Sequence, residues 1–332
     1  MARLLAGTDA AALGEAASRL AAGQLVAFPT ETVYGLGARA DDDTAVARIF
    51  AAKGRPADHP LIVHVPSAEA AATFAAEIPP VAQRLMQAFW PGPLTVIVPR
   101  RDGMAAAAAG GQGTVGLRCP SHPVAQALLR AAAEQGVRGV AAPSANRFGR
   151  VSPTLASHVA SEFEHDDVLV LDGGACEVGI ESSIVDCSRG YPVLLRPGRL
   201  TAAEIEAAAA EPLRERDDQA PRASGTLAAH YAPRAKVRLM DAAQLRSALD
   251  VAGEALAKQS PPTVAVYSRS VRPGRGIVHR TMPDRAAAAA HELFAVLREL
   301  DASGVQLIWV EEPPPAAEWD GVRDRLARAA AA

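Results

Sequence analysis

Residues 25–37 read LVAFPTETVYGLG, and this stretch decides the fold. A run of four apolar residues ends at Pro29, and a polar cluster that includes Thr30, Glu31 and Thr32 follows at once. A short apolar run of this kind predicts a buried strand. Polar groups at the carboxyl end of such a strand lie where open α/β sheets bind their ligands. The alternative is an ordinary strand exit whose Thr and Tyr side chains only satisfy turn hydrogen bonds.

The first 200 residues alternate short apolar runs with helical patterns, which predicts one α/β domain with a large mixed sheet. The predicted strands are 25–29, 60–65, 94–99, 114–119, 139–142, 168–172, 182–186 and 192–196. The predicted helices are 8–22, 43–53, 67–77, 79–89, 122–135, 154–163 and 201–209. We expect a large, twisted, mixed-sheet catalytic domain with a concave cleft over residues 1–206.

A charged, proline-containing stretch without periodicity interrupts this alternation, and residues 207–234 are predicted to be a linker. The alternation then resumes, and a small Rossmann-like α/β domain is predicted over residues 235–332. Its strands are expected at 236–240, 263–268, 276–280 and 306–312, and its helices at 242–257, 284–300 and 317–330.

The composition excludes several classes of protein. The 332 residues carry a formal net charge of −3, so no global basic field attracts nucleic acid or a membrane surface. No apolar stretch reaches the roughly 18 residues of a membrane span. The three cysteines form no CxxC or Cys/His ligand pattern, and we interpret them as reduced thiols in a cytoplasmic protein.

Two residue types stand out by their rarity. Lysine occurs only at positions 53, 236 and 258, and asparagine only at Asn146. A sequence that replaces these residues elsewhere makes each remaining one a candidate for a site that needs its side chain. Lys53 and Asn146 both fall inside polar motifs.

The second motif supplies cations at a helix end. Lys53 and Arg55 flank Gly54 where the helix 43–53 ends, and His59 and His64 follow. One cation at a helix C-terminus is explained by the macrodipole alone. Two cations, a glycine that allows close approach and two histidines favour an anion site.

The third motif is a glycine-rich loop at 110–116 that contains a G-x-G-x-x-G match. We reject a dinucleotide site, because these glycines precede a strand instead of opening a helix and no acid follows at the required offset. Thr114 and Arg118 alternate onto one face of the strand. A carboxylate or phosphate partner is favoured for Arg118 over a surface position.

The fourth, fifth and sixth polar motifs, counted with the cluster at Thr30, Glu31 and Thr32 as the first, also follow strands. APSANR at 142–147, with Ser152 beyond it, offers hydroxyls, the single Asn and arginines suited to the phosphates and sugar of a nucleotide. GIESS at 179–183 is the weakest motif alone, and RPG begins at Arg196. The cations of these loops are Lys53, Arg55, Arg118, Arg147, Arg150 and Arg196. Basic loops on an acidic domain predict a cleft for a polyanionic ligand.

The sequence also narrows the mechanism. It contains no Walker A motif, no G-x-S-x-G elbow and no His/Cys metal cluster. Positioning and charge neutralisation, not a covalent nucleophile, are therefore expected to dominate.

Taken in order, PTETVYGLG, KGRP with HPL and a later His, FWPGPLT, GLRCP, APSAN, ESSIVD and LLRPG resemble the L-threonylcarbamoyl-AMP synthases. The resemblance covers roughly residues 5–205. The linker that ends in HYAP and the small C-terminal domain are similar to the two-domain form of that family. The resemblance implies conversion of L-threonine, bicarbonate and ATP to threonylcarbamoyl-AMP and pyrophosphate, for threonylcarbamoyladenosine modification of tRNA.

The resemblance also implies a role for each matching residue. The threonine pocket would be lined by Thr32, His64, Arg118, Ala142 and Ser182. ATP would be held by Lys53, Arg55, His59, Thr114, Ser144, Asn146, Ser152 and Arg196, with Tyr231 of HYAP as a lid over the nucleotide. Mg²⁺ would accompany ATP without an acidic cage, so no metal ligand is assigned. The product would pass to the downstream tRNA-modifying transferase machinery, and neither a membrane nor stable nucleic-acid binding is expected.

The segment before HYAP departs from the family pattern, because SGTLAA lacks the Lys, Tyr and Arg expected there. Three rival functions remain open: an α/β module that binds tRNA or double-stranded RNA without chemistry, a carbamoyl-transferring enzyme of metallocentre maturation, and a regulatory nucleotide sensor. The second is disfavoured because such chains are much longer and carry zinc-finger and acylphosphatase segments. Threonine-dependent turnover would separate the remaining two from a synthase.

Overall fold

The computed structural model describes residues 1–332, apart from the side chain of Ala257. It divides into two compact units. The first comprises residues 1–148 and 152–226, and the second comprises residues 149–151 and 227–332. The predicted linker 207–234 is therefore shared, since its residues up to Thr226 pack with the first unit.

The first unit contains a ten-stranded mixed sheet, in the order β1-β8-β2-β3-β7-β4-β6-β5-β9-β10. Its strands are β1 (Arg3–Ala6), β2 (Val26–Phe28), β3 (Gly35–Arg39), β4 (Ile62–His64), β5 (Leu94–Pro99), β6 (Thr114–Arg118), β7 (Val140–Ala141), β8 (Leu169–Asp172), β9 (Ser183–Asp186) and β10 (Val193–Arg196). Its helices are α1 (Ala10–Ala21), α2 (Asp43–Lys53), α3 (Ala68–Ala71), α4 (Pro80–Phe89), α5 (Pro123–Glu134), α6 (Ala156–Glu162) and α7 (Ala202–Ala209). The large mixed sheet predicted from the sequence is confirmed.

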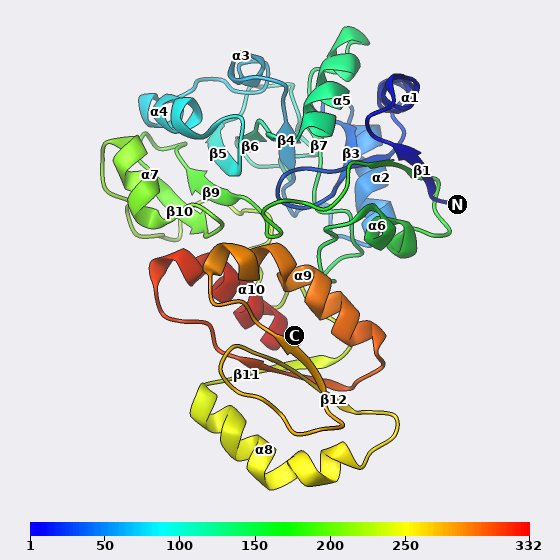
Figure 1. The fold of residues 1–332 in the computed structure, drawn as a ribbon. Coiled ribbons are helices and arrows are strands. Elements are labelled where there is room, and N and C mark those ends of the chain that lie inside the picture. Colours follow the sequence, from blue (N-terminus) through cyan, green and yellow to red (C-terminus); the bar gives the residue numbers. More distant parts are fainter. The chain divides into compact units, whose positions relative to one another are not determined.

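Strand β2 shows how the sheet buries both faces. Val26 and Phe28 pack into the cluster beneath α1 and α5, which lie side by side in Figure 1. Ala27, between them, points into the cluster on the opposite face. The apolar run lacks a polar side because a strand covered on both faces has no solvent side.

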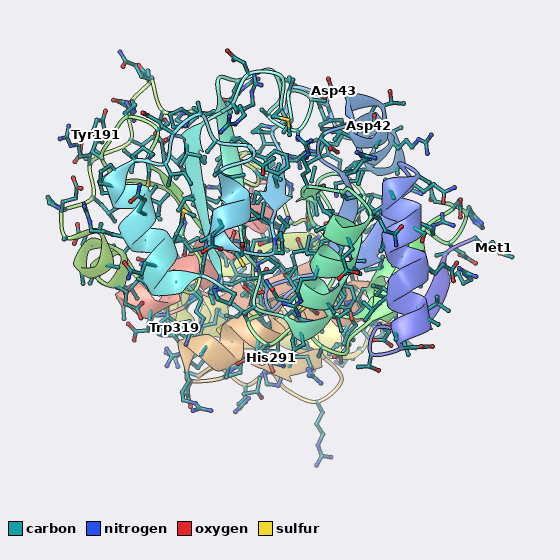
Figure 2. All side chains as sticks on the ribbon, turned by 90° about the horizontal axis from the view of Figure 1, so that it is seen from above. Met1, Asp42, Asp43, Tyr191, His291 and Trp319 are labelled. Carbon is teal, nitrogen blue, oxygen red and sulfur yellow. The ribbon has the colours of Figure 1, made fainter. Side chains whose placement is uncertain are left out.

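The start of α2 follows the expected capping chemistry. Asp42 precedes α2 and accepts hydrogen bonds from the backbone N–H groups of Thr44 and Ala45. Figure 2 labels Asp42 and Asp43 at this end of the helix. Gly54 ends α2 with φ of 63°, a left-handed conformation that glycine adopts without strain. The cap therefore fixes where Lys53 and Arg55 leave the helix.

Three predictions about the first unit are wrong in detail. Strands β1 and β3 were not expected, and the helix predicted at 67–77 is only the single turn α3. Gly37 explains why β3 lacks a strand pattern. A Cβ atom there would lie 2.7 Å from Val140 and 2.8 Å from Phe28, so only glycine fits. Without a side chain at this position, the sequence lacks the alternation by which a strand is recognised.

The second unit contains a four-stranded sheet in the order β11-β14-β12-β13, and every neighbouring pair is parallel. Its elements are β11 (Lys236–Met240), α8 (Ala242–Ala257), β12 (Val264–Ser268), β13 (Val278–Thr281), α9 (Ala286–Ala302), β14 (Leu307–Glu311), the 3₁₀ turn η1 (Ala317–Trp319) and α10 (Asp320–Ala330). Figure 1 shows α8 on one face of this sheet and α9 with α10 on the other. The small parallel α/β domain is confirmed.

Candidate active site

Two side chains predicted for the threonine pocket stand next to each other at strand ends. His64 ends β4, Arg118 ends β6, and the two residues are register partners in this parallel pair. Both are buried, with 3% and 4% of their surface exposed. Topology therefore brings together two motifs that lie 54 positions apart in the sequence.

The guanidinium of Arg118 already has a carboxylate partner. Its Nη2 donates to Glu31 Oε1 at 2.7 Å, and the other oxygen of Glu31 accepts from the backbone N–H of Ser121 at 3.0 Å. Both side chains are almost fully buried. Loss of one partner from such a pair leaves an uncompensated buried charge, so Glu31 and Arg118 must be treated as a unit.

Sequence reasoning placed Glu31 in the first motif but gave it no role. The available signal was its position: an acid directly after a buried strand and between two threonines. Thr30 and Thr32 are themselves buried, and their hydroxyls lie 2.8 Å apart. An acid in this setting needs a cation, and Arg118 supplies it.

His64 is a neutral imidazole at physiological pH. Burial, reinforced by the positive charge of Arg118, lowers the pKa of His64 to about 3. Among the described residues, its Nδ1 has no hydrogen-bond partner. The ring can therefore exchange a hydrogen bond with a bound molecule, but it cannot act as a base that holds a proton at neutral pH.

The other residues predicted for this pocket are also buried in the first unit. The hydroxyl of Ser182 lies 2.8 Å from that of Thr95 on β5. The backbone N–H of Ala142 donates to the carbonyl of Ile62 at 2.9 Å, which joins the fourth motif to β4. The carbonyl of Glu31 accepts from the backbone N–H of Val178, the residue directly before the fifth motif.

Lys53 holds the loop of the fourth motif. Its Nζ donates to the carbonyl of Ser144 at 2.6 Å and to that of Asn146. Burial, together with the nearby charge of Arg55, lowers the pKa of Lys53 well below its ordinary value. The ammonium therefore organises the Ser144–Asn146 loop in addition to any part it has in binding phosphates.

Arg55 and His59 share an aromatic neighbour. The guanidinium of Arg55 lies 5.9 Å from the ring centroid of Phe148, and the ring of His59 lies 5.4 Å from it. Burial and the charge of Arg55 lower the pKa of His59, which favours its neutral form. Arg55 also donates to the carbonyl of Pro60 at 2.9 Å.

Arg196 spans the fifth and sixth motifs. Its Nε and Nη2 donate to the carbonyl of Ser182 at 3.1 and 2.9 Å, and its Nη1 donates to the carbonyl of Ser224 at 2.8 Å. Only 2% of its surface is exposed. This two-point grip fixes the backbone beside the predicted threonine pocket.

The remaining ATP candidates have separate surroundings. The hydroxyl of Ser152 donates to Glu181, a second buried acid that the sequence left without a role. Thr114 lines a small pocket with residues of β4 and β5. Arg147, expected among the phosphate-binding cations, instead forms an ion pair with Asp166.

Tyr231 belongs to the second unit, as does Arg150. The ring of Tyr231 is buried, and its centroid lies 5.5 Å from that of the Phe294 ring and 5.4 Å from the guanidinium carbon of Arg325. The backbone φ of Tyr231 is 61°, which is uncommon for a residue with a side chain. Its role as a lid over the nucleotide stays a prediction.

No group of three or more His, Cys, Asp or Glu side chains that could hold a metal ion occurs among the described residues. Glu181 contacts one nucleotide candidate directly, since it accepts a hydrogen bond from the hydroxyl of Ser152. Such a donor set suits Mg²⁺ that arrives with ATP and keeps its phosphate and water ligands.

No helix in the described part of the chain has the length and apolar character of a membrane span.

Comparison with known proteins gives the same assignment as the motifs. Residues 18–198 match the family model described as "Telomere recombination", and residues 200–331 match "Threonylcarbamoyl-AMP synthase, C-terminal domain". The chain belongs to the threonylcarbamoyl-AMP synthase family. A threonylcarbamoyl-AMP synthase of Pyrococcus abyssi is 40% identical over 303 residues, which cover 89% of this chain and 87% of the relative. One of Bacillus subtilis is 36% identical over 330 residues, 96% and 92% of the two chains.

A solved structure extends the family match to the whole fold. The crystal structure of P. abyssi Sua5 complexed with L-threonine has a TM-score of 0.88 and 36% identity to this chain. The match covers 99% of this chain and 97% of the other. The two-domain form expected from the sequence is therefore confirmed.

Proposed function

We propose that this chain makes threonylcarbamoyl-AMP and pyrophosphate from L-threonine, bicarbonate and ATP. It would thus act as a nucleotidyltransferase that supplies the threonylcarbamoyl group for adenosine modification of tRNA. The proposal extends to this chain the activity named for its Pyrococcus and Bacillus relatives. The consumer of the product would be a tRNA-modifying transferase.

One observation carries the proposal: motifs spread over some 165 positions are joined by direct contacts in the first unit. The fourth motif joins the first, since Ala145 N–H donates to the carbonyl of Tyr34 at 2.8 Å. It joins the second through Lys53 and the fifth through the Ser152–Glu181 hydrogen bond. A shared set of loops can hold an amino acid against a nucleoside triphosphate.

Arg118 is the proposed partner of the threonine carboxylate, because a planar guanidinium can hold a carboxylate at two points. Glu31 keeps the pocket electrically neutral before the zwitterionic substrate enters. The neutral ring of His64 would offer a hydrogen bond without adding charge. Thr32, Ala142 and Ser182 would complete the wall of the threonine pocket.

The proposed ATP site uses the loops beside this pocket. Arg55 and Arg196 are the cations expected near the phosphates, with Lys53 holding the Ser144–Asn146 loop. His59, Thr114 and Ser152 would contact the nucleotide, and Tyr231 would close over it. Mg²⁺ bound to ATP would neutralise phosphate charge and so ease departure of pyrophosphate.

The proposed chemistry proceeds in two steps. Bicarbonate loses hydroxide to give CO₂, and the neutral amine of threonine attacks the CO₂ carbon to form a carbamate. The proton that the amine loses combines with the released hydroxide as water. A carbamate oxygen then attacks the α-phosphorus of ATP, and the bond from that phosphorus to the bridging oxygen breaks to release pyrophosphate. Exclusion of water protects the labile carbamate between the steps.

We infer a cytoplasmic location from the cysteines. Cys119, Cys176 and Cys187 are all buried free thiols. Free thiols suit a reducing compartment, where ATP is also available. Burial raises the pKa of all three thiols, which disfavours a nucleophilic thiolate in the reaction.

A non-catalytic RNA-binding module is not favoured, because the relatives that match nearly the whole chain are named as synthases. The deciding experiment measures pyrophosphate release from ATP with the purified chain. Release should require both threonine and bicarbonate, and omission of either should reduce it to background. ATP binding without threonine-dependent release would instead favour a nucleotide sensor, and release that ignores threonine would contradict the proposal.

A further inference from the structure

Gln112 occupies a rigidly built position in the glycine-rich loop before β6. The preceding Gly110 has φ of 60°, and a Cβ atom there would lie 2.5 Å from the carbonyl oxygen of Asp58. Gly110 thus packs directly on the chain beside His59. Arg100 Nε donates to the carbonyl of Gln112 at 3.0 Å and holds the loop from the other side. A side chain anchored in this way can position another segment.

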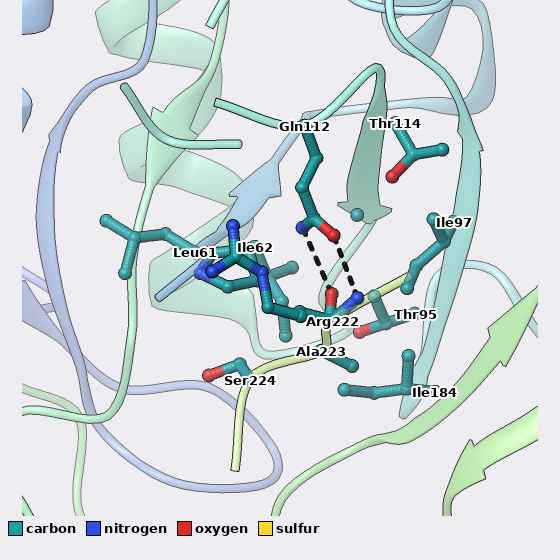
Figure 3. A pocket seen from close by; sticks show the side chains of 12 residues that line it. Leu61, Ile62, Thr95, Ile97, Gln112, Thr114, Ile184, Arg222, Ala223 and Ser224 are labelled. Atoms are coloured by element: carbon teal, nitrogen blue, oxygen red, sulfur yellow. Dashed lines mark hydrogen bonds between the residues drawn. The ribbon is translucent and has the colours of Figure 1, made fainter. Parts of the chain in front are cut away.

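The side-chain amide of Gln112 holds the backbone of Arg222, a residue of the predicted linker. Its Oε1 accepts from the N–H of Arg222 at 2.8 Å, and its Nε2 donates to the carbonyl of Arg222 at 3.2 Å (Figure 3). The two bonds use the donor and the acceptor of one residue, as a neighbouring strand would. Both bonds are made to the backbone of Arg222 and not to its side chain, so they fix the path of the linker backbone at this residue.

Two residues further on, the linker meets both cations expected at the phosphates. The carbonyl of Ser224 accepts from Arg196 at 2.8 Å, and its hydroxyl lies 3.5 Å from Arg55 Nη2. Ser224 therefore stands between two motifs that are 141 positions apart. It belongs to the first unit, so these contacts are internal to that unit.

Between these two points, Ala223 covers apolar side chains of the sheet. It packs against a cluster that contains Ile62, Ile97 and Ile184. The pocket beneath it, drawn in Figure 3, holds about 20 Å³, which is room for one water molecule. At this point the linker therefore packs against the sheet of the first unit and does not act as a flexible connection.

We propose that Gln112 is a positioning residue for the nucleotide site: its amide fixes Arg222 so that Ser224 orients Arg55 and Arg196. The proposal rests on the proposed function for the identity of the ligand, ATP. Gln112 itself is not placed in contact with ATP. Gln112 acts through the linker. The lid role assigned to the HYAP end of the linker does not require this contact.

A competing account gives the same task to the ion pair of Arg222 with Asp58. Their N–O distance is 3.0 Å, but the two side chains are 52% and 61% exposed. Exposed pairs of this kind contribute little to stability, because water screens the charges and both side chains lose conformational freedom. Arg222 also donates to the carbonyl of Gly110 at 3.1 Å, again from an exposed side chain. The amide contact should therefore dominate over the Arg222 side chain.

The test compares the ATP affinity of three variants with that of the unchanged protein by calorimetry, without threonine. Gln112→Met keeps the length of the side chain but removes both hydrogen bonds to Arg222, together with one from Nε2 to the carbonyl of Ala109 at 3.3 Å, and it should raise the Kd for ATP about 10-fold. Arg222→Ala removes only the side chain, and it should change that Kd less than 3-fold. Gln83→Ala is the matched control, because Gln83 also donates its amide to a backbone carbonyl, that of Ile78; it should change nothing.

A second readout follows the linker itself. Trypsin should cut the Arg214–Arg222 stretch several times faster in Gln112→Met than in the unchanged protein, while threonine affinity stays within 2-fold. Unchanged ATP affinity in Gln112→Met, or an equal loss of ATP and threonine affinity, would overturn the proposal. Neither readout needs turnover, so a protein without pyrophosphate release would refute the synthase activity while leaving this test intact.

Discussion

Both units contain parallel strands, but polar side chains at the carboxyl ends of these strands are used differently in the two units. In the first unit, His64 and Arg118 end parallel strands, and the Nδ1 of His64 has no partner among the described residues. In the second unit, the carboxylate of Glu311 at the end of β14 accepts the backbone N–H groups of Arg269, Ser270 and Val271. That turn would otherwise suit an anion.

The comparison teaches that location at a sheet edge is not enough to make a site. The second unit fills its own anion-binding turn, and the hydroxyl of Ser270 adds a fourth hydrogen bond to Glu311 at 2.7 Å. These hydrogen bonds outweigh the cost of burial and lower the pKa of Glu311. A binding site also needs polar atoms at the sheet edge that have no hydrogen-bond partner within the protein. In the first unit, the Nδ1 of His64 is such an atom among the described residues.

The largest effect is expected at the centre of the first unit. Arg118→Ala should lower kcat/KM for threonine at least 100-fold, about 2.7 kcal/mol, because it removes a two-point partner of the substrate carboxylate. Initial rates of pyrophosphate release against threonine concentration measure this. Arg84→Ala, which breaks an ion pair with Glu211 in the same unit, is the control and should leave KM for threonine unchanged.

A second substitution at Glu31 separates the two expected effects of Arg118→Ala, the loss of stability and the loss of threonine binding. Arg118→Ala leaves the Glu31 carboxylate buried and unpaired, which should cost about 3–5 kcal/mol of stability. The double variant with Glu31→Ala should regain stability without regaining threonine binding. Recovery of both would mean that Arg118 supports the fold and does not contact the substrate.

Much of this arrangement could be predicted from the sequence, because the motifs follow apolar runs that had to be strands. The pairing of Arg118 with Glu31 could not, since Arg118 ends β6 and Glu31 follows β2, and three other strands lie between β2 and β6 in the sheet order. Strand β3 was missed because Gly35 and Gly37 hide its alternation. The path of the linker was missed because contacts to Gln112 and Arg196 leave no periodic pattern.

In the second unit, Glu311→Ala should lower stability by about 2–3 kcal/mol, because three backbone N–H groups lose their acceptor. Denaturant unfolding followed by the fluorescence of Trp309 and Trp319 measures this. Glu312→Ala changes an exposed neighbour and should have little effect. KM for threonine should stay the same in both variants; a rise in KM for Glu311→Ala would show that the two edges are not independent.

A smaller effect concerns His64 and pH. Its pKa is depressed to about 3 in the folded protein, against about 6.5 when unfolded, so the unfolded chain binds the extra proton as pH falls below 6.5. Between pH 7.5 and 5.5 the protein should therefore lose about 1.4 kcal/mol more stability than His64→Gln. Urea unfolding at both pH values tests this, and equal losses would mean that the pKa of His64 is the same in the folded and unfolded protein.

The smallest effect is expected at Asp58. Asp58→Asn removes its exposed ion pair with Arg222 and should change stability and ATP affinity by no more than about 0.5 kcal/mol. The same titrations used for Gln112 provide the measurement. A loss as large as that of Gln112→Met would transfer the positioning role from the amide to the ion pair.

The most direct test of the central claim uses bicarbonate labelled with ¹³C. The purified chain is incubated with labelled bicarbonate, threonine and ATP with Mg²⁺, and the products are read by mass spectrometry. We expect threonylcarbamoyl-AMP that carries one labelled carbon, formed in step with pyrophosphate and lost in Arg118→Ala. Pyrophosphate released without any labelled adenylate would contradict it.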